Sequence, residues 1–310
     1  MNSPLYKEKE ERKLQAVIKD ISKEIQKNEN NSELYFNRAL QYYQLSQQYY
    51  DVLELFIEGD KEKYFKYVNK AYEDVDKALS FKQEIADYAY SFKLFMLKKL
   101  KRWDALINYG KELYNSIGCT DSDLILIGEA YFYLKDWNNC IEYYTKIIDK
   151  MGYEKANSFN RKIFLERGLA YDELDKNEAA LNDYLQYLDL NGASPFDRYN
   201  IYALIAVQYE KLGNYKKAIE FYTKSLEEYT ESTSIYFRRG KIYLDMFRDY
   251  SNAAEDFYKA IECSDTDNYF CYHECGYSYC HKAEIDIDNK NYQLALQDYD
   301  RAIWAYGCAM

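Results

Sequence analysis

Small, aromatic and aliphatic residues recur at fixed spacings through the middle of the chain. A small residue is followed three positions later by tyrosine, and three positions after that by leucine or methionine. A second small residue comes 12 or 13 positions after the first, and an aromatic ring follows it by four. This order occurs four times, starting at Gly128, Gly168, Ala206 and Gly240. Spacings of three and four place apolar side chains on one side of a helix, so each copy predicts two amphipathic helices.

The small residues have a steric explanation. We expect them where the two helices of a pair cross most closely, because only Gly, Ala, Ser or Cys fits there. The aromatic rings then fill the space beside the crossing. The residues that complete the four copies are Tyr131, Leu134, Cys140 and Tyr144; Tyr171, Leu174, Ala180 and Tyr184; Tyr209, Leu212, Ala218 and Tyr222; and Tyr243, Met246, Ala253 and Phe257.

This pattern resembles the tetratricopeptide repeat, a unit of about 34 residues with G-x2-Y in its first helix and A-x3-F in its second. Gly240 and Tyr243, followed by Ala253, Phe257 and Ala260, match it most fully. The proline that closes a family repeat is nearly absent. The resemblance implies an all-α fold: a right-handed α-solenoid of about seven helix-turn-helix repeats, preceded by an N-terminal capping helix.

The pattern extends toward both ends with longer spacings. The first repeat has its small residues at Ala39 and Ala71, which adds 20 residues to the usual spacing of 12. The last repeat has Gly276, and we place its second small residue at Ala295, which adds seven. We expect a capping helix within 1–30 and one continuous solenoid over 31–310 without an internal boundary. The repeats are expected at about 32–84, 87–120, 121–154, 161–194, 199–232, 233–267 and 269–308.

Composition agrees with long helices and short loops. The chain has 2 prolines and 11 glycines in 310 residues, too few for the many turns of a β-sandwich or barrel. Its 38 tyrosines supply a large core. The net charge of −11 argues against binding to nucleic acid or an anionic membrane. The N-terminal stretch lacks the apolar run of a secretory signal, so we expect a cytoplasmic protein.

Five of the 7 cysteines follow residue 260, and both histidines lie among them. Zinc favours such ligands. However, Cys271 and Cys275 share one helical face, whereas His273 and Cys280 share another, with His281 near the second. Four ligands therefore do not converge from this helix, and we expect packed thiols rather than a metal site. No catalytic or nucleotide-binding motif occurs, so we expect no enzyme activity and no cofactor.

The family resemblance implies a concave groove lined by the first helix of each repeat. Such a groove could hold a protein or peptide ligand through apolar anchors and polar ends. The basic residues with which co-chaperone members of the family grip a chain-end carboxylate are missing. The candidate binding residues, carried over by position, are Asn37, Phe95, Lys98, Glu129, Phe132, Asp172, Glu210, Arg238, Lys241, His273 and Tyr277.

The function that this resemblance implies is a non-catalytic scaffold or adaptor for protein–protein interaction. One alternative is a peptide-sensing regulatory receptor that acts through protein partners, because the segment before the first repeat is too short for a DNA-binding domain. Another is a toxin-neutralising or secretion chaperone, for which the acidic charge is a mild indication.

Two further surfaces are candidates for partner binding. The long first hairpin, 46–65, has the apolar residues Tyr50, Leu53, Phe56 and Ile57 near its tip. They form either a docking surface or a cluster covered by the returning helix, which contains Tyr64, Tyr67 and Val68.

The other surface is the C-terminal edge, where Trp304 and Tyr306 stand in the last turns. A partner or a second copy could cover this edge, which makes a homodimer possible there.

Overall fold

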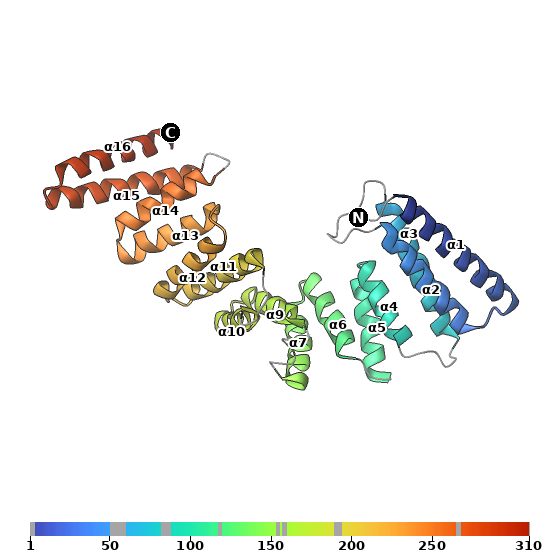
Figure 1. Cartoon of the computed structure of the whole chain (residues 1–310). Helices are drawn as coiled ribbons and strands as arrows, with labels where there is room; N and C mark the ends of the chain where they lie inside the picture. The colour runs from blue at the N-terminus through green and yellow to red at the C-terminus, as the bar shows by residue number, and fades with distance from the viewer. Residues whose placement is uncertain are drawn as a thin grey trace. The chain divides into compact units, whose positions relative to one another are not determined.

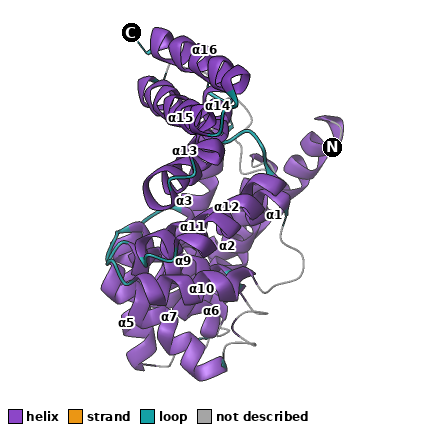
Figure 2. Ribbon diagram, turned by 90° about the vertical axis from the view of Figure 1, so that its left-hand side faces the viewer, coloured by secondary structure: helices purple, strands orange, loops and turns teal. Residues whose placement is uncertain are grey.

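A computed structural model of the chain describes residues 4–49, 60–81, 88–116, 120–152, 156, 160–188, 194–264 and 268–309, with side chains from residue 8 onward. Every regular element in these residues is a helix and none is a strand, which confirms the predicted all-α fold (Figure 2). The α-helices are α1 (Pro4–Lys27), α2 (Ser32–Ser46), α3 (Lys61–Ser80), α4 (Tyr88–Lys99), α5 (Trp103–Ser116), α6 (Asp121–Tyr133), α7 (Trp137–Met151), α9 (Lys162–Asp172), α10 (Asn177–Leu188), α11 (Pro195–Lys211), α12 (Tyr215–Glu228), α13 (Thr233–Ile242), α14 (Tyr250–Glu262), α15 (Tyr269–Asp288) and α16 (Tyr292–Cys308).

The chain divides into two compact units, an N-terminal unit (Met1–Tyr153) and a C-terminal unit (Glu154–Met310). Within each unit, consecutive helices pack as antiparallel pairs, as α15 and α16 show in Figure 1. The pairs are α2/α3, α4/α5 and α6/α7 in the N-terminal unit, and α9/α10, α11/α12, α13/α14 and α15/α16 in the C-terminal unit. Helix α1 packs against α2 and buries Leu14, Ile18 and Ile25.

The two helices of a pair cross at the small residues, as predicted. A Cβ atom added to Gly128 would stand 2.6 Å from the ring of Tyr144, and one added to Gly168 would stand 2.6 Å from Tyr184. These distances are shorter than carbon–carbon contact allows. The ring of the second helix therefore fills the space that the missing side chain of the first helix leaves.

The last repeat differs from the expectation. Gly276 faces Tyr306, which follows it by 30 positions, whereas Tyr144 follows Gly128 by only 16. The hairpin is thus 14 residues longer than a standard one, and the expected lengthening of seven, based on Ala295, was wrong. Seven residues are about two helical turns, so adding seven to each helix keeps the same faces in contact.

The turns between paired helices that the structure describes share one geometry, and in most of them a residue other than glycine takes the left-handed position. After Tyr131, for example, Lys135 adopts φ 59°. The next residue, Asp136, donates its N–H to the Tyr131 carbonyl oxygen at 2.9 Å, and its side chain caps α7 by accepting the Asn139 N–H. This Schellman-type turn needs one left-handed residue. The corresponding residues are Lys101, Lys135, Asp175, Gly213, Arg248 and Lys290.

One repeat carries an extra residue, which accounts for its spacing of 13. The end of α13 continues as a π-helical turn, Tyr243–Phe247. A π-turn absorbs a single inserted residue without ending the helix. The crossing at Gly240 keeps its place: an added Cβ would stand 3.1 Å from the ring of Phe257.

Two half-buried arginines each join three successive helices. The guanidinium of Arg239 in α13 binds both carboxylate oxygens of Asp256 in α14, at 2.9 and 2.7 Å, and the hydroxyl of Thr223 in α12 at 2.8 Å. Arg38 in α2 does the same with Asp74 in α3 and Ser22 in α1. Helix α1 thus occupies the place of a preceding second helix, as expected of a cap.

The same positions hold either a charged pair or two apolar residues. Arg167 and Asp183 form a bidentate pair at 2.8 and 2.7 Å, with both side chains buried. Burial raises the pKa of Asp183, while its hydrogen bond to Arg167 opposes this rise. In the repeat of α6 and α7 the equivalent residues are Ile127 and Tyr143, both buried. The fold therefore needs the volume at these positions more than the charges.

The tip of the first hairpin falls outside the described residues, and with it Tyr50, Leu53, Phe56 and Ile57. The described part of the returning helix is buried at Tyr64 and Val68. Tyr67 stacks on Tyr42 and Tyr49, with ring centroids 6.3 and 5.7 Å away. The base of this hairpin is thus part of the N-terminal core.

The crossing geometry predicts opposite effects for two glycine substitutions. Gly128→Ala should lower the free energy of unfolding by about 1–3 kcal/mol, because its Cβ collides with the Tyr144 ring. The control is Gly307→Ala: nothing lies within 4 Å of a Cβ there, so the higher helix propensity of alanine should stabilise the protein by up to about 1 kcal/mol. Urea denaturation measures both changes. Equal effects of the two variants would contradict the role assigned to the crossing.

The buried pair of Arg167 and Asp183 predicts that substitutions at these two positions have non-additive effects on stability. Asp183→Ala should cost about 3–5 kcal/mol, because Arg167 stays buried without its carboxylate. Arg167→Ile combined with Asp183→Tyr copies Ile127 and Tyr143 and should restore the wild-type stability. Thermal unfolding followed by circular dichroism compares the variants. A double variant as unstable as the single one would show that the charges themselves are required.

Candidate functional site

All eleven candidate residues lie on the first helices of the pairs. Asn37, Arg238, His273 and Tyr277 are exposed, most others are half-buried, and Glu129 is buried with 4 % of its surface exposed. By helix, the residues are Asn37 on α2; Phe95 and Lys98 on α4; Glu129 and Phe132 on α6; Asp172 on α9; Glu210 on α11; Arg238 and Lys241 on α13; and His273 and Tyr277 on α15.

In the C-terminal unit, ion pairs join each first helix to the next one. They run from α9 to α11, from α11 to α13 and from α13 to α15. The pairs are Asp172–Lys211 at 2.6 Å, Glu210–Arg238 at 3.5 Å and Lys241–Glu274 at 3.4 Å. We call the surface of α9, α11, α13 and α15 that carries these pairs the first-helix face. Sequence analysis missed Lys211 and Glu274, although opposite charges about one repeat apart were a usable signal.

A tyrosine of the underlying second helix, α12, also fixes the Glu210 side chain. The hydroxyl of Tyr222, the crossing ring of α12, donates a hydrogen bond to its carboxylate at 2.6 Å. Burial first, and then this hydrogen bond, raises the pKa of Tyr222. The crossing therefore fixes the orientation of a charged side chain on the first-helix face.

An aromatic stripe follows α15 on the same face. It consists of Tyr269, His273, Tyr277 and His281, each four positions after the one before. Tyr269 and His273 stack with ring centroids 6.0 Å apart, and Tyr277 and His281 meet edge-on at 4.4 Å. Sequence analysis treated His281 mainly as a possible metal ligand. In the structure it stacks on Tyr250 of α14 at 5.0 Å.

In the N-terminal unit, four of the five candidate residues are engaged in packing, whereas Asn37 is exposed. Lys98 and Glu129 join α4 to α6 through an ion pair at 2.6 Å. Phe95 meets Tyr43 at 5.4 Å, and Phe132 contacts the ring of Trp137. These residues hold neighbouring helices together and offer less free surface than the stripe of α15.

The cysteines of α15 are packed into the core. Burial raises the pKa of Cys275 to about 12 and that of Cys271 to about 11, so both are neutral thiols at pH 7. Across the described part of the chain, no three His, Cys, Asp or Glu side chains come together so as to hold a metal ion. Among the helices that the structure describes, none has both the length and the apolar character needed to cross a bilayer.

Antiparallel helix pairs with a small residue at each crossing, repeated along the chain, define a helical-repeat protein. Comparison with protein families specifies the kind of repeat. Residues 199–230, which cover α11 and α12, and residues 124–150, which cover α6 and α7, each match a family model described as tetratricopeptide repeat. The chain therefore contains tetratricopeptide repeats in these two segments, as the sequence pattern predicted.

Solved structures with a similar fold are also repeat proteins. The C-terminal part of a TPR repeat-containing protein from Cytophaga hutchinsonii is 15 % identical, with a TM-score of 0.52, and the match covers 79 % of this chain and 93 % of that one. A MamA fragment from Desulfovibrio magneticus RS-1 is 17 % identical, with a TM-score of 0.47 and coverage of 59 % and 100 %. YrrB, described as a TPR protein with an unusual peptide-binding site, is 15 % identical, with a TM-score of 0.46 and coverage of 63 % and 90 %. A search of curated proteins finds no match.

The likeness to the Cytophaga hutchinsonii structure, at 15 % identity and a TM-score of 0.52, shows the fold alone. Tetratricopeptide repeats are in general non-catalytic interaction modules, and their presence supports a role as a protein–protein interaction scaffold.

Proposed function

We propose that this chain is a scaffold that binds a protein or peptide partner on the first-helix face of its C-terminal unit. The aromatic stripe of α15 carries the proposal. Tyr269 and Tyr277 are both exposed, although their rings are large and mostly apolar. Tyrosine and histidine combine apolar area with a polar group, and such side chains are frequent anchors in protein interfaces.

The length of the stripe suits a short peptide. From Tyr269 to His281 it spans 12 residues, or about 18 Å along the helix. An extended peptide covers about 3.3 Å per residue, so five or six residues would lie along it. Lys241 and Glu274 stand beside the stripe and offer both signs of charge to a polar ligand.

The ion pairs of the first-helix face preorganise it for binding. They hold successive first helices at fixed spacing before any partner arrives, so little side-chain ordering remains to oppose association. Asp172 and Glu210 belong to these pairs, and reversing either charge would also disturb helix spacing. The aromatic residues are therefore the better probes of binding.

Truncation of the stripe should weaken partner binding without unfolding the protein. Tyr277→Ala combined with His273→Ala should raise the Kd of a purified protein partner by about 30-fold or more, the usual effect of losing an aromatic anchor. Partners would be identified by affinity capture with the wild-type chain, and the Kd measured by calorimetry.

The matched control is Tyr114→Ala, which removes an exposed tyrosine from α5 of the N-terminal unit. It should leave the Kd unchanged. A partner that binds the double variant as tightly as the wild type would remove the stripe from the proposed function.

We also infer that a second copy of the chain covers the outer surface of α16. Tyr292, Leu296 and Ile303 are 64 %, 63 % and 70 % exposed, at spacings that place them along one side of the helix. Trp304, the residue favoured by the sequence for this edge, is 43 % exposed, and its ring lies 5.8 Å from that of Tyr258. Ile303 next to it is the more exposed of the two.

The position of Ile303 supports this inference. It stands three residues before the crossing ring of its repeat, as do Leu181, Ile219 and Ala254 in earlier second helices. These helices pack against the next repeat, and Ala254 is buried. Ile303 therefore belongs to a surface that is built for helix packing. A two-fold dimer would bury the same residues on both copies.

Light scattering coupled to size-exclusion chromatography tests the dimer. The wild type should have twice the monomer mass, and Ile303→Glu with Leu296→Glu should have the monomer mass, because four charges would meet in the interface. The control Ile285→Glu, at an exposed position of α15, should stay dimeric. A wild type that remains monomeric at its highest soluble concentration would contradict the inference.

A further inference from the structure

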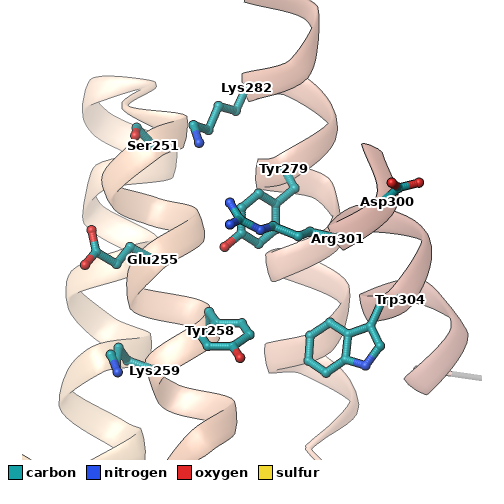
Figure 3. A pocket seen from close by; sticks show the side chains of 9 residues that line it. All are labelled: Ser251, Glu255, Tyr258, Lys259, Tyr279, Lys282, Asp300, Arg301 and Trp304. Carbon is teal, nitrogen blue, oxygen red and sulfur yellow. The ribbon is translucent and has the colours of Figure 1, made fainter. Parts of the chain in front are cut away.

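A pocket of about 770 Å³ lies between α14 and α16, with α15 as its floor (Figure 3). It is separate from the aromatic stripe: Tyr279, in the floor, follows Tyr277 by two positions and so points about 200° away around α15. Its lining residues are Ser251, Glu255, Tyr258, Lys259, Tyr279, Lys282, Asp300, Arg301 and Trp304.

Two cations in this pocket share one buried carboxylate. Lys282 lies 3.0 Å from Asp298, whose side chain is only 2 % exposed, and Arg301 lies 3.2 Å from it. Two positive charges against one negative charge leave one positive charge in excess. The guanidinium of Arg301 reaches Asp298 through Nη1 alone, and its side chain is 54 % exposed. Its other nitrogens remain available to an acceptor that enters the pocket.

Around the two cations, the pocket is lined by carboxylates and aromatic rings. Glu255 and Asp300 are exposed carboxylates, and no ion pair within the described residues engages them. The rings of Tyr258 and Trp304 meet at 5.8 Å and form an aromatic wall beside Arg301. Lys259 is already paired with Glu262 at 2.7 Å. The pocket thus combines two cations, Lys282 from α15 and Arg301 from α16, with an anionic rim and an aromatic wall.

We propose that this pocket binds a short peptide segment through a carboxylate. The carboxylate takes the free nitrogens of Arg301 and the ammonium of Lys282, where charge-assisted hydrogen bonds are strong. A basic side chain next to it meets Glu255 or Asp300, and an apolar side chain lies on Trp304. A volume of about 770 Å³ is within the range of peptide and small-ligand pockets. The site is independent of the first-helix face and goes beyond the function proposed for it.

The negative net charge of the chain limits where a ligand carboxylate can bind. A net charge of −11 repels acidic ligands in general, so a carboxylate is favoured only next to Lys282 and Arg301, which share the single carboxylate of Asp298, and not at the rim formed by Glu255 and Asp300. Binding should weaken as salt rises, because a half-open pocket is screened by ions.

Capped tetrapeptides test the proposal by calorimetry at low salt. The acetylated and amidated peptide Lys-Leu-Glu-Leu should bind the full chain about tenfold or more tightly than the same peptide with Gln in place of Glu. A third peptide, with Gln and a free chain-end carboxylate, distinguishes the two sources of the carboxylate. Tight binding of either carboxylate peptide over the capped Gln peptide supports the site.

Arg301→Gln should abolish the preference for the carboxylate, while Lys282 still neutralises Asp298 and keeps the hairpin folded. The control Lys224→Gln removes an exposed cation of α12 that is paired with Glu220 outside the pocket, and it should keep the preference. Tyr277→Ala should also keep it, which separates this site from the first-helix face. Equal affinities for the three peptides, no binding of any of them, or a preference that survives Arg301→Gln would each overturn the proposal.

Discussion

The close approach of a backbone and an aromatic ring at four of the helix crossings, those of Gly128, Gly168, Gly240 and Gly276, is the constraint on which the rest of the structure depends. Where Gly128 meets Tyr144 or Gly168 meets Tyr184, an added methyl group would overlap the ring. A helix pair that meets at a fixed point has a fixed geometry, and copies of the pair can then stack through their remaining apolar sides. Even the long last hairpin keeps this contact, because it grew by whole turns on both helices.

Hydrogen bonds and ion pairs connect the helices in addition to this apolar packing. Two half-buried arginines each join three helices, as Arg239 does with Thr223 and Asp256. The surface ion pairs join first helices to one another, and the hydroxyl of Tyr222 links a crossing to Glu210. Packing within the repeats thus positions the charges and rings of the first-helix face, which connects the fold to the proposed binding function.

The sequence predicted the fold well, because most of the crossings impose a local and periodic demand for a small residue and a ring. It predicted less of the surfaces. Glu129 was taken for a ligand contact and is buried in an ion pair, since the pairing depends on a residue about 30 positions away. Tyr306 was missed as a crossing ring because the added turns place it 30 positions after Gly276, whereas Tyr144 follows Gly128 by 16. The pocket around Arg301 could not be foreseen, because three helices form it.

A double-mutant cycle between Gly128 and Tyr144 tests the central claim most directly. Urea unfolding of Gly128→Ala, Tyr144→Leu and the double variant gives the coupling free energy between the two positions. If the ring and the backbone compete for the same space, the smaller leucine should relieve the collision, and the double variant should be more stable than the sum of the single changes by about 1 kcal/mol or more. Strictly additive losses would show that the crossing does not depend on this contact.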